Sequence, residues 1–102
     1  MALLVVFEGV EGSGKTTQTQ ILRDKLLGMN LPAITTREPG GTSSGELIRN
    51  LILQQEDLTP ISELYLFNAA RSLLIEQLVM PTLANGVHVI MDRFIYSTVA
   101  YQ

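Results

Sequence analysis

Glycines and one lysine near the N-terminus have the spacing of a phosphate-binding loop. Residues 9–16 read G-V-E-G-S-G-K-T and match the pattern G-x-x-x-x-G-K-[ST]. Glycines let backbone N–H groups turn inward around a phosphate, Lys15 can reach the β- and γ-phosphates of a nucleotide, and Thr16 can bind Mg²⁺. A glycine-rich turn with an exposed lysine is the alternative, which the position between a predicted strand and a predicted helix disfavours. The residues expected to contact nucleotide phosphates are Gly9, Glu11, Gly12, Ser13, Gly14, Lys15, Thr16 and Thr17.

An acidic residue ends the last apolar segment of the chain. Asp92 follows Val87–Met91, which is typical of a buried strand, and a carboxylate there can meet Mg²⁺ or its waters beside Thr16. Aspartate is also favoured as a helix N-cap, and the two roles are compatible. We therefore expect Thr16 and Asp92 to be the metal ligands.

Two arginines also follow predicted strands. Arg37 and Arg93 should project from the edge of the sheet where ligands bind, and guanidinium groups suit bidentate binding of phosphate. Surface ion pairing is the alternative. Two arginines at equivalent strand ends in a chain of net charge −3 favour the phosphate role.

Phe67 and Arg71 lie one helical turn apart and could together hold a flat base, the ring by stacking and the guanidinium by donating to a carbonyl. Phe67 also belongs to an apolar stripe with Leu64, Leu74 and Leu78. Periodicity alone favours core packing for this phenylalanine, so both interpretations stay open at this point.

Strand-like and helical segments alternate along the chain. The predicted elements are strands at 3–7, 32–36 and 87–91, a helix at 16–27 ended by Gly28, a loop at 37–44, a helix at 45–54, a long helix from Thr59-Pro60 that Pro81 ends or kinks, and a further helix from Phe94. This alternation predicts an α/β fold with a parallel sheet, right-handed crossovers and a ligand site at one sheet edge. Glu8 and His88 receive no functional role, and His88 is expected to be packed and hydrogen-bonded.

Composition excludes several classes of protein. The chain is 46% hydrophobic and 17% charged, which indicates a folded domain, and it contains no cysteine for a disulfide or thiolate metal site. A net charge of −3 argues against broad attachment to nucleic acid. Its apolar segments are too short for a membrane span, so no membrane association and a cytoplasmic location are expected.

Four segments, together with the phosphate-binding loop, closely resemble the thymidylate kinase family. They are Glu11 within the loop, Thr36–Thr42 (T-R-E-P-G-G-T), Phe67 with Arg71, and Asp92-Arg93-Phe94 followed by Ser97, Ala100, Tyr101 and Gln102. The resemblance spans the chain, and the glycine after Glu11 indicates the bacterial type. It implies a three-layer P-loop NTPase fold of the nucleoside monophosphate kinase kind, incomplete in this chain. Residues 1–102 would form the N-terminal half of one domain, with the mobile lid in the part beyond Gln102.

The resemblance also implies an activity and a set of roles. The γ-phosphate of ATP, bound with Mg²⁺, would pass directly to dTMP to give dTDP for dTTP biosynthesis, in a homodimeric enzyme. Lys15, Asp92 and Arg93 would be catalytic, and Glu11 would bind the 3′-hydroxyl of the acceptor. The residues implied to bind dTMP are Glu11, Arg37, Phe67, Arg71, Arg93, Ser97, Tyr101 and Gln102.

Three other functions are known for chains with such a phosphate-binding motif or are compatible with it. Another nucleoside monophosphate kinase is disfavoured by Glu11 and the R-E-P-G-G-T segment. A GTPase switch would need D-x-x-G after the third strand, where the chain has D-R-F-I. A non-catalytic nucleotide-binding fragment remains an alternative for these 102 residues alone, because the clamp supplied by the lid would be missing.

We predict that the isolated 102-residue chain is inactive as a kinase and only marginally stable or self-associated, because it would lack the lid and further strands to cover its sheet edges. The measurement is ADP formation from ATP and dTMP by a chain whose mass has been verified. Turnover above the uncatalysed rate would contradict this expectation.

Overall fold

Three parallel strands form the sheet of the computed structural model, which describes residues 1–9 and 14–94 and, of residues 15 and 94, the backbone alone. The strands are β1 (Leu4–Gly9), β2 (Ala33–Glu38) and β3 (His88–Phe94), in the order β1-β3-β2. The predicted α/β class with a parallel sheet is confirmed. Glu11, Gly12, Ser13, Ser97, Tyr101, Gln102 and most of the helix predicted from Phe94 lie outside the described residues.

The strands reach two or three residues further than the apolar segments predicted. Arg37 lies inside β2, and Asp92 and Arg93 lie inside β3, whereas the sequence placed all three after their strands. The register explains the extension: Arg37 is paired with Asp92, and Glu8 and Glu38 flank Arg93 on the neighbouring strands. Charges of opposite sign are thus adjacent across the strands, which stabilises a polar end of a sheet.

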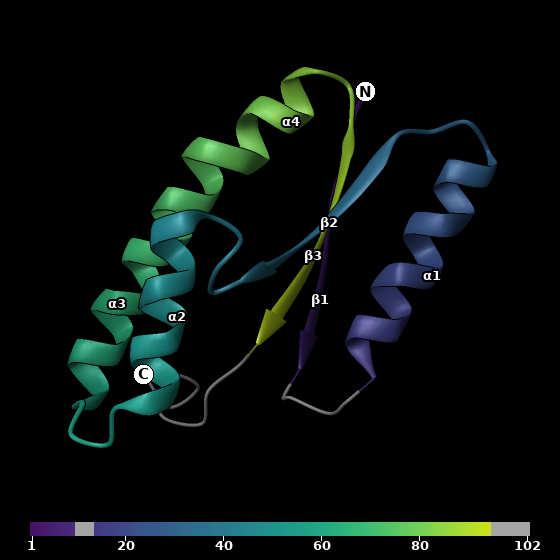
Figure 1. Cartoon of the computed structure of the whole chain (residues 1–102). Helices are drawn as coiled ribbons and strands as arrows, with labels where there is room; N and C mark the ends of the chain where they lie inside the picture. The colour runs from purple at the N-terminus through teal and green to yellow at the C-terminus, as the bar shows by residue number, and fades with distance from the viewer. Residues whose placement is uncertain (10–13, 95–102) are drawn as a thin grey trace.

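Helices cover the sheet from two sides (Figure 1). The helical elements are α1 (Lys15–Gly28), α2 (Ser43–Gln54), α3 (Pro60–Leu74), the π-helix η1 (Ile75–Val79) and α4 (Met80–Ala84). In Figure 1 α1 stands on one side of the strands, while α2, α3 and α4 stand on the other. Within the described part of the chain, no helix is both long and apolar enough to cross a bilayer.

The apolar core lies between β3 and the second group of helices. Leu74 and Val79 pack against Val89 and Met91. Partly buried apolar side chains of the neighbouring strands, and Leu83, pack against this cluster. Side chains alternate along a strand, so Ile90 points to the opposite face, which α1 covers. Apolar residues on both faces of β3 account for the uninterrupted hydrophobic run of residues 89–91 within it.

Pro81 does not end the long helix, although an end there is one of the two effects predicted for it. The helical course continues to Ala84, and the π-helical turns of η1 precede the proline, with the N–H of Met80 donating to the carbonyl of Ile75. Pro81 then occupies the first turn of α4, where its missing N–H costs little. The start of α3 follows the prediction, since Thr59 caps it reciprocally with Ser62.

Gly40 and Gly41 adopt positive φ angles of 128° and 82°. A Cβ atom on Gly41 would lie 2.5 Å from Oγ1 of Thr36 and 2.7 Å from Cδ1 of Leu74. The turn between β2 and α2 can therefore pack against the core only with glycine at this position.

We predict that Gly41→Ala destabilises the protein by about 2–5 kcal/mol, combining left-handed backbone strain with overpacking against Leu74. Gly28→Ala is the matched control, since a Cβ there meets nothing within 4 Å, and it should change stability by less than about 1 kcal/mol. Urea unfolding of the two variants measures the difference, and equal stabilities would refute the packing argument.

Candidate phosphate-transfer site

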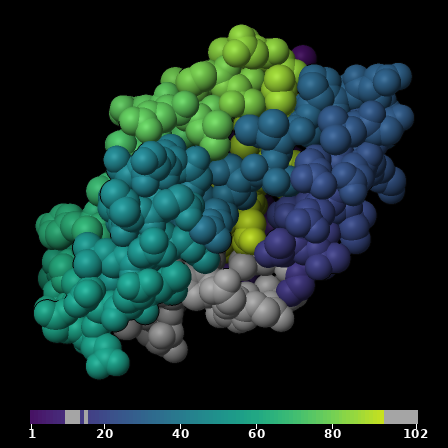
Figure 2. Space-filling view, in the orientation of Figure 1, coloured from purple at the N-terminus to yellow at the C-terminus, as the bar shows by residue number. Residues whose placement is uncertain are grey.

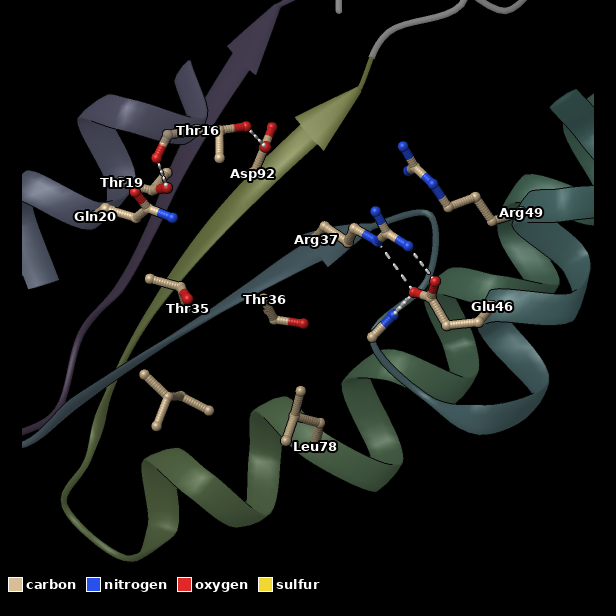
Figure 3. Close-up of a pocket in the computed structure, with 12 residues that line it drawn as sticks. Thr16, Thr19, Gln20, Thr35, Thr36, Arg37, Glu46, Arg49, Leu78 and Asp92 are labelled. Carbon is tan, nitrogen blue, oxygen red and sulfur yellow. Dashed lines mark hydrogen bonds and ion pairs between the residues drawn. The ribbon is translucent and has the colours of Figure 1, made fainter. Parts of the chain in front are cut away.

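The first turn of α1 lies against the end of β3. Oγ1 of Thr16 donates a hydrogen bond to Oδ2 of Asp92 at 2.9 Å, and Figure 3 shows the two side chains facing each other. Gly14 precedes α1 with a φ of 83°, a left-handed conformation that glycine adopts without strain. The structure thus brings together the two predicted metal ligands. Gly9 ends β1 and Thr17 is exposed on α1.

Hard oxygen atoms at this position suit Mg²⁺. Thr16 supplies a hydroxyl and Asp92 a carboxylate, and among the described residues no group of three or more His, Cys, Asp and Glu side chains gathers as a metal cage. Mg²⁺ is normally held by one or two protein oxygens together with substrate phosphates and waters. The donor set therefore fits a metal that arrives with a nucleotide.

The strand register directs Asp92 and Arg93 to opposite faces of the sheet. Asp92 is paired with Arg37 on the face covered by α1, whereas Arg93 is paired with Glu8 and Glu38 on the face covered by α3. The two arginines that the resemblance assigns to one phosphate, Arg37 and Arg93, therefore start from opposite faces. Any joint contact with a phosphate must form beyond the strand ends, where long side chains can converge.

Four charged residues form a network on the α3 face, which we call the carboxylate–arginine cluster: Glu8, Glu38, Arg71 and Arg93. Arg93 Nη1 donates to Glu8 Oε1 at 2.6 Å, and Arg71 Nε donates to Glu38 Oε1 at 2.5 Å. Arg93 also approaches Glu38, with Nη2 3.5 Å from Oε2 and Nε 3.5 Å from Oε1. The side chain of Glu38 is only 1% exposed, so it is the buried centre of the cluster.

Phe67 and Arg71 meet as the helical spacing predicted. The guanidinium carbon of Arg71 lies 5.2 Å from the centre of the Phe67 ring, within cation–π range. Phe67 is 5% exposed, a burial that fits the core-packing alternative, while its contact with Arg71 fits the base-binding pair. The assignment to a base stays a prediction.

Arg37 is held by Glu46 from the first turn of α2. Its Nε donates to Oε2 at 3.2 Å and its Nη2 to Oε1, while the N–H of Gly41 donates to Oε2 at 2.7 Å. The hydrogen bond from Arg37 lowers the pKa of Glu46, and the Gly41 N–H acts in the same direction against the opposing effect of burial. The ion pair considered as an alternative for the arginines is thus present at Arg37, whose side chain remains 50% exposed.

A cavity of about 460 Å³ opens between α1 and the helices on the other side of β2. Figure 2 shows the hollow, with β3 (yellow) visible between α1 and α2. Polar side chains from α1, β2 and α2 line most of it, and Figure 3 shows Arg37 directed toward Glu46. The lining residues are Thr16, Thr19, Gln20, Ile34, Thr35, Thr36, Arg37, Gly41, Glu46, Arg49, Leu78 and Asp92.

Sequence reasoning assigned no ion pair to Glu38, missed Glu46 and Arg49, and left Glu8 without a role. Glu38 and Glu46 pair with the arginines, and Arg49, 7% exposed, donates from Nη1 to the carbonyl of Pro39 at 3.0 Å. The available signal was the rule that clustered arginines in an acidic chain need carboxylate partners. His88 was interpreted correctly, since its Nδ1 accepts the N–H of Leu3 at 3.0 Å.

We predict that the ion pair of Glu46 adds stability that is lost in acid. Because its folded pKa is lowered, the contribution is present above the ordinary carboxyl pKa and disappears as the pH falls through the folded value. Relative to wild type, Glu46→Gln should cost less than about 1 kcal/mol near pH 7, since both partners are at least one-third exposed, and a smaller amount at about pH 3. Urea unfolding at both pH values measures this, with the exposed Glu76→Gln as control. A cost for Glu46→Gln that does not change with pH would contradict the assignment.

Comparisons with known proteins agree with the geometry. The sequence model of the family described as Thymidylate kinase matches residues 7–102. Thymidylate kinases of Chlorobium limicola and of a Roseiflexus species are 46% and 47% identical to the chain over 98% and 100% of its length, and the chain spans 46% of each of them. The crystal structure of thymidylate kinase from Ehrlichia chaffeensis matches with a TM-score of 0.84 and 42% identity, covering 98% of this chain and 57% of that one. The chain belongs to the thymidylate kinase family.

Proposed function

We propose that the intact protein transfers the γ-phosphate of ATP to dTMP, forming dTDP. The observation that supports this proposal is that adjacent residues at the end of β3 point to opposite faces of the sheet. Asp92 meets Thr16, the last residue of the predicted phosphate-binding motif, and Arg93 joins the cluster that contains Arg71. A donor site on one face and an acceptor site on the other would then meet at one strand end.

The donor side is assigned to the loop and the start of α1. Backbone N–H groups of residues 9–17, with Lys15, would bind the phosphates of ATP, aided by the positive end of the α1 dipole. Mg²⁺, held by Thr16 and Asp92, would neutralise charge on the transferring phosphate. Thr16 and Asp92 already lie within hydrogen-bond distance, so the protein need not reorganise to form this part of the site.

The acceptor side is assigned to arginines and to Phe67. Arg93 and Arg37 would bind the phosphate of dTMP, which offsets the repulsion between two anions brought close together. Phe67 and Arg71 would hold the thymine base. A phosphate acceptor is already ionised near neutral pH, since its second pKa is about 6, so direct attack needs no strong general base and no phosphoenzyme.

Further parts of the assignment rest on the family and on composition. We propose Glu11, Ser97, Tyr101 and Gln102 as additional dTMP contacts, and a homodimer in the cytoplasm. The exposed Ile61 and Tyr65 on α3, 61% and 71% accessible, are compatible with an interface there. Residues 1–102 would supply the phosphate-binding half of one kinase domain, in keeping with the share of the relatives that they cover.

We predict that Thr16→Ala and Asp92→Asn in the intact protein each lower kcat for dTMP on the order of 100-fold, because each removes an oxygen aimed at the metal and the transferring phosphate. Gln18→Ala, an exposed position on the same helix, is the control and should keep normal turnover. ADP formation with ATP, Mg²⁺ and dTMP, AMP or GMP gives the readout.

Near-normal turnover by either site variant would contradict the donor-site assignment. Preference of the wild-type protein for AMP or GMP over dTMP would instead contradict the choice of acceptor. The two parts of the proposal therefore fail separately.

A further inference from the structure

A single buried carboxylate connects the two arginines assigned to different parts of the acceptor. Glu38 is 1% exposed, and its Oε1 accepts from Arg71 at 2.5 Å while Nη2 and Nε of Arg93 lie 3.5 Å from its oxygens. A carboxylate is expensive to bury unless cations and hydrogen bonds compensate it. Arg71 and Arg93 therefore depend on the same group, although one is assigned to the base and the other to the phosphate.

We propose that Glu38 is a positioning residue that fixes Arg71 and Arg93 in one arrangement, so that recognition of the base and recognition of the phosphate are energetically coupled. This inference rests on the proposed function, because it concerns the site assigned to dTMP. Glu38 acts through the arginines and needs no contact of its own with the substrate.

The fold makes Glu38 suited to this task. It ends β2 in direct register with Arg93, so its backbone is fixed by the sheet. Arg71 reaches it from α3, which makes Glu38 the point where strand and helix meet. The bond through Nε occupies one edge of the Arg71 guanidinium, while the other N–H groups of that planar group keep a defined direction.

Glu8 could be considered for the same role, but it fits less well. Its contact with Arg93 is short, at 2.6 Å, yet its side chain is 50% exposed, and no contact joins it to Arg71 within the described residues. Solvent screens an exposed pair much more than a buried one. Among the residues that the structure describes, only Glu38 touches both arginines.

Positioning and simple electrostatics make opposite predictions. If Glu38 acted only as a nearby negative charge, its removal would strengthen binding of the anionic phosphate. If it holds the arginines, its removal lets them move and weakens binding. The sign of the change in dTMP affinity therefore separates the two roles.

The experiment measures dissociation constants of dTMP, thymidine and ATP for the intact protein by calorimetry. The ratio of the thymidine constant to the dTMP constant isolates the contribution of the phosphate. Glu38→Gln should weaken dTMP about tenfold or more and lower this ratio, with ATP affinity within about twofold of wild type, as expected when a charged hydrogen-bond partner is lost. The exposed Glu76→Gln, which removes the same charge elsewhere, should change none of the three.

A second variant tests the coupling without changing the buried residue. Arg71→Met lies at a side chain that is 37% exposed, but it removes a partner of the buried Glu38, so its melting temperature is measured with the affinities to show that the variant is folded. If the base and phosphate subsites are independent, it weakens thymidine and dTMP equally and leaves the ratio unchanged. If Glu38 couples the two subsites, Arg93 becomes its remaining arginine partner in this variant. Glu38 then attracts Arg93 away from the phosphate of dTMP, so the ratio of the two dissociation constants falls at least about threefold.

The outcomes are distinguishable. Equal or tighter binding of dTMP by Glu38→Gln, a lower melting temperature with an unchanged ratio, or an unchanged ratio in Arg71→Met overturns the coupling while leaving the proposed function in place. Failure of the wild-type protein to bind dTMP overturns the proposed function and this inference with it.

Discussion

The register of β3 between β1 and β2 is the constraint on which the site depends. Because neighbouring residues of a strand point to opposite faces, Asp92 must face α1 when Arg93 faces α3. A slip of one residue would exchange them, taking Asp92 away from Thr16 and bringing Arg93 to the wrong face. The apolar residues of β3 prevent that slip, since Val89 and Met91 fill the core beside Leu74 and Val79. Apolar packing along β3 therefore determines which face of the sheet each charged residue at its end occupies.

Charge balance is the second constraint on the site. The chain is acidic overall, yet each described arginine assigned to a ligand has a carboxylate partner: Arg37 with Glu46, and Arg71 and Arg93 with Glu38. Such pairs keep guanidinium groups oriented without a substrate. They also mean that a bound phosphate must compete with or add to existing contacts, so its net binding energy is smaller than the contacts alone would indicate.

Local features of the backbone also position the residues of the site. The positive φ angles of Gly40 and Gly41 turn the chain from β2 into α2, and the Gly41 N–H holds the carboxylate of Glu46 that orients Arg37. On the other side, the π-helical turns of η1 let the long helix pass Pro81 and keep Leu74 and Val79 on the core. Each feature is local, but it affects where the side chains at the strand ends lie.

The sequence by itself predicted a phosphate-binding loop and determined the alternation of strands and helices, the parallel sheet and the family. These follow from local signals: glycine spacing, apolar periodicity and short motifs. The same signals placed the strand ends too early and left open whether Pro81 ends or kinks the long helix, because a polar residue in a strand or a proline in a helix is tolerated only where tertiary neighbours compensate it.

Only the tertiary structure decided the pairing of the charges. Glu8 and Arg93 are 85 positions apart, and Glu38 and Arg71 are 33 apart, yet each pair is in contact. No local pattern could have linked them. Periodicity records the face that a residue occupies on its own element, whereas the partner of a buried charge depends on which elements become neighbours in the folded sheet.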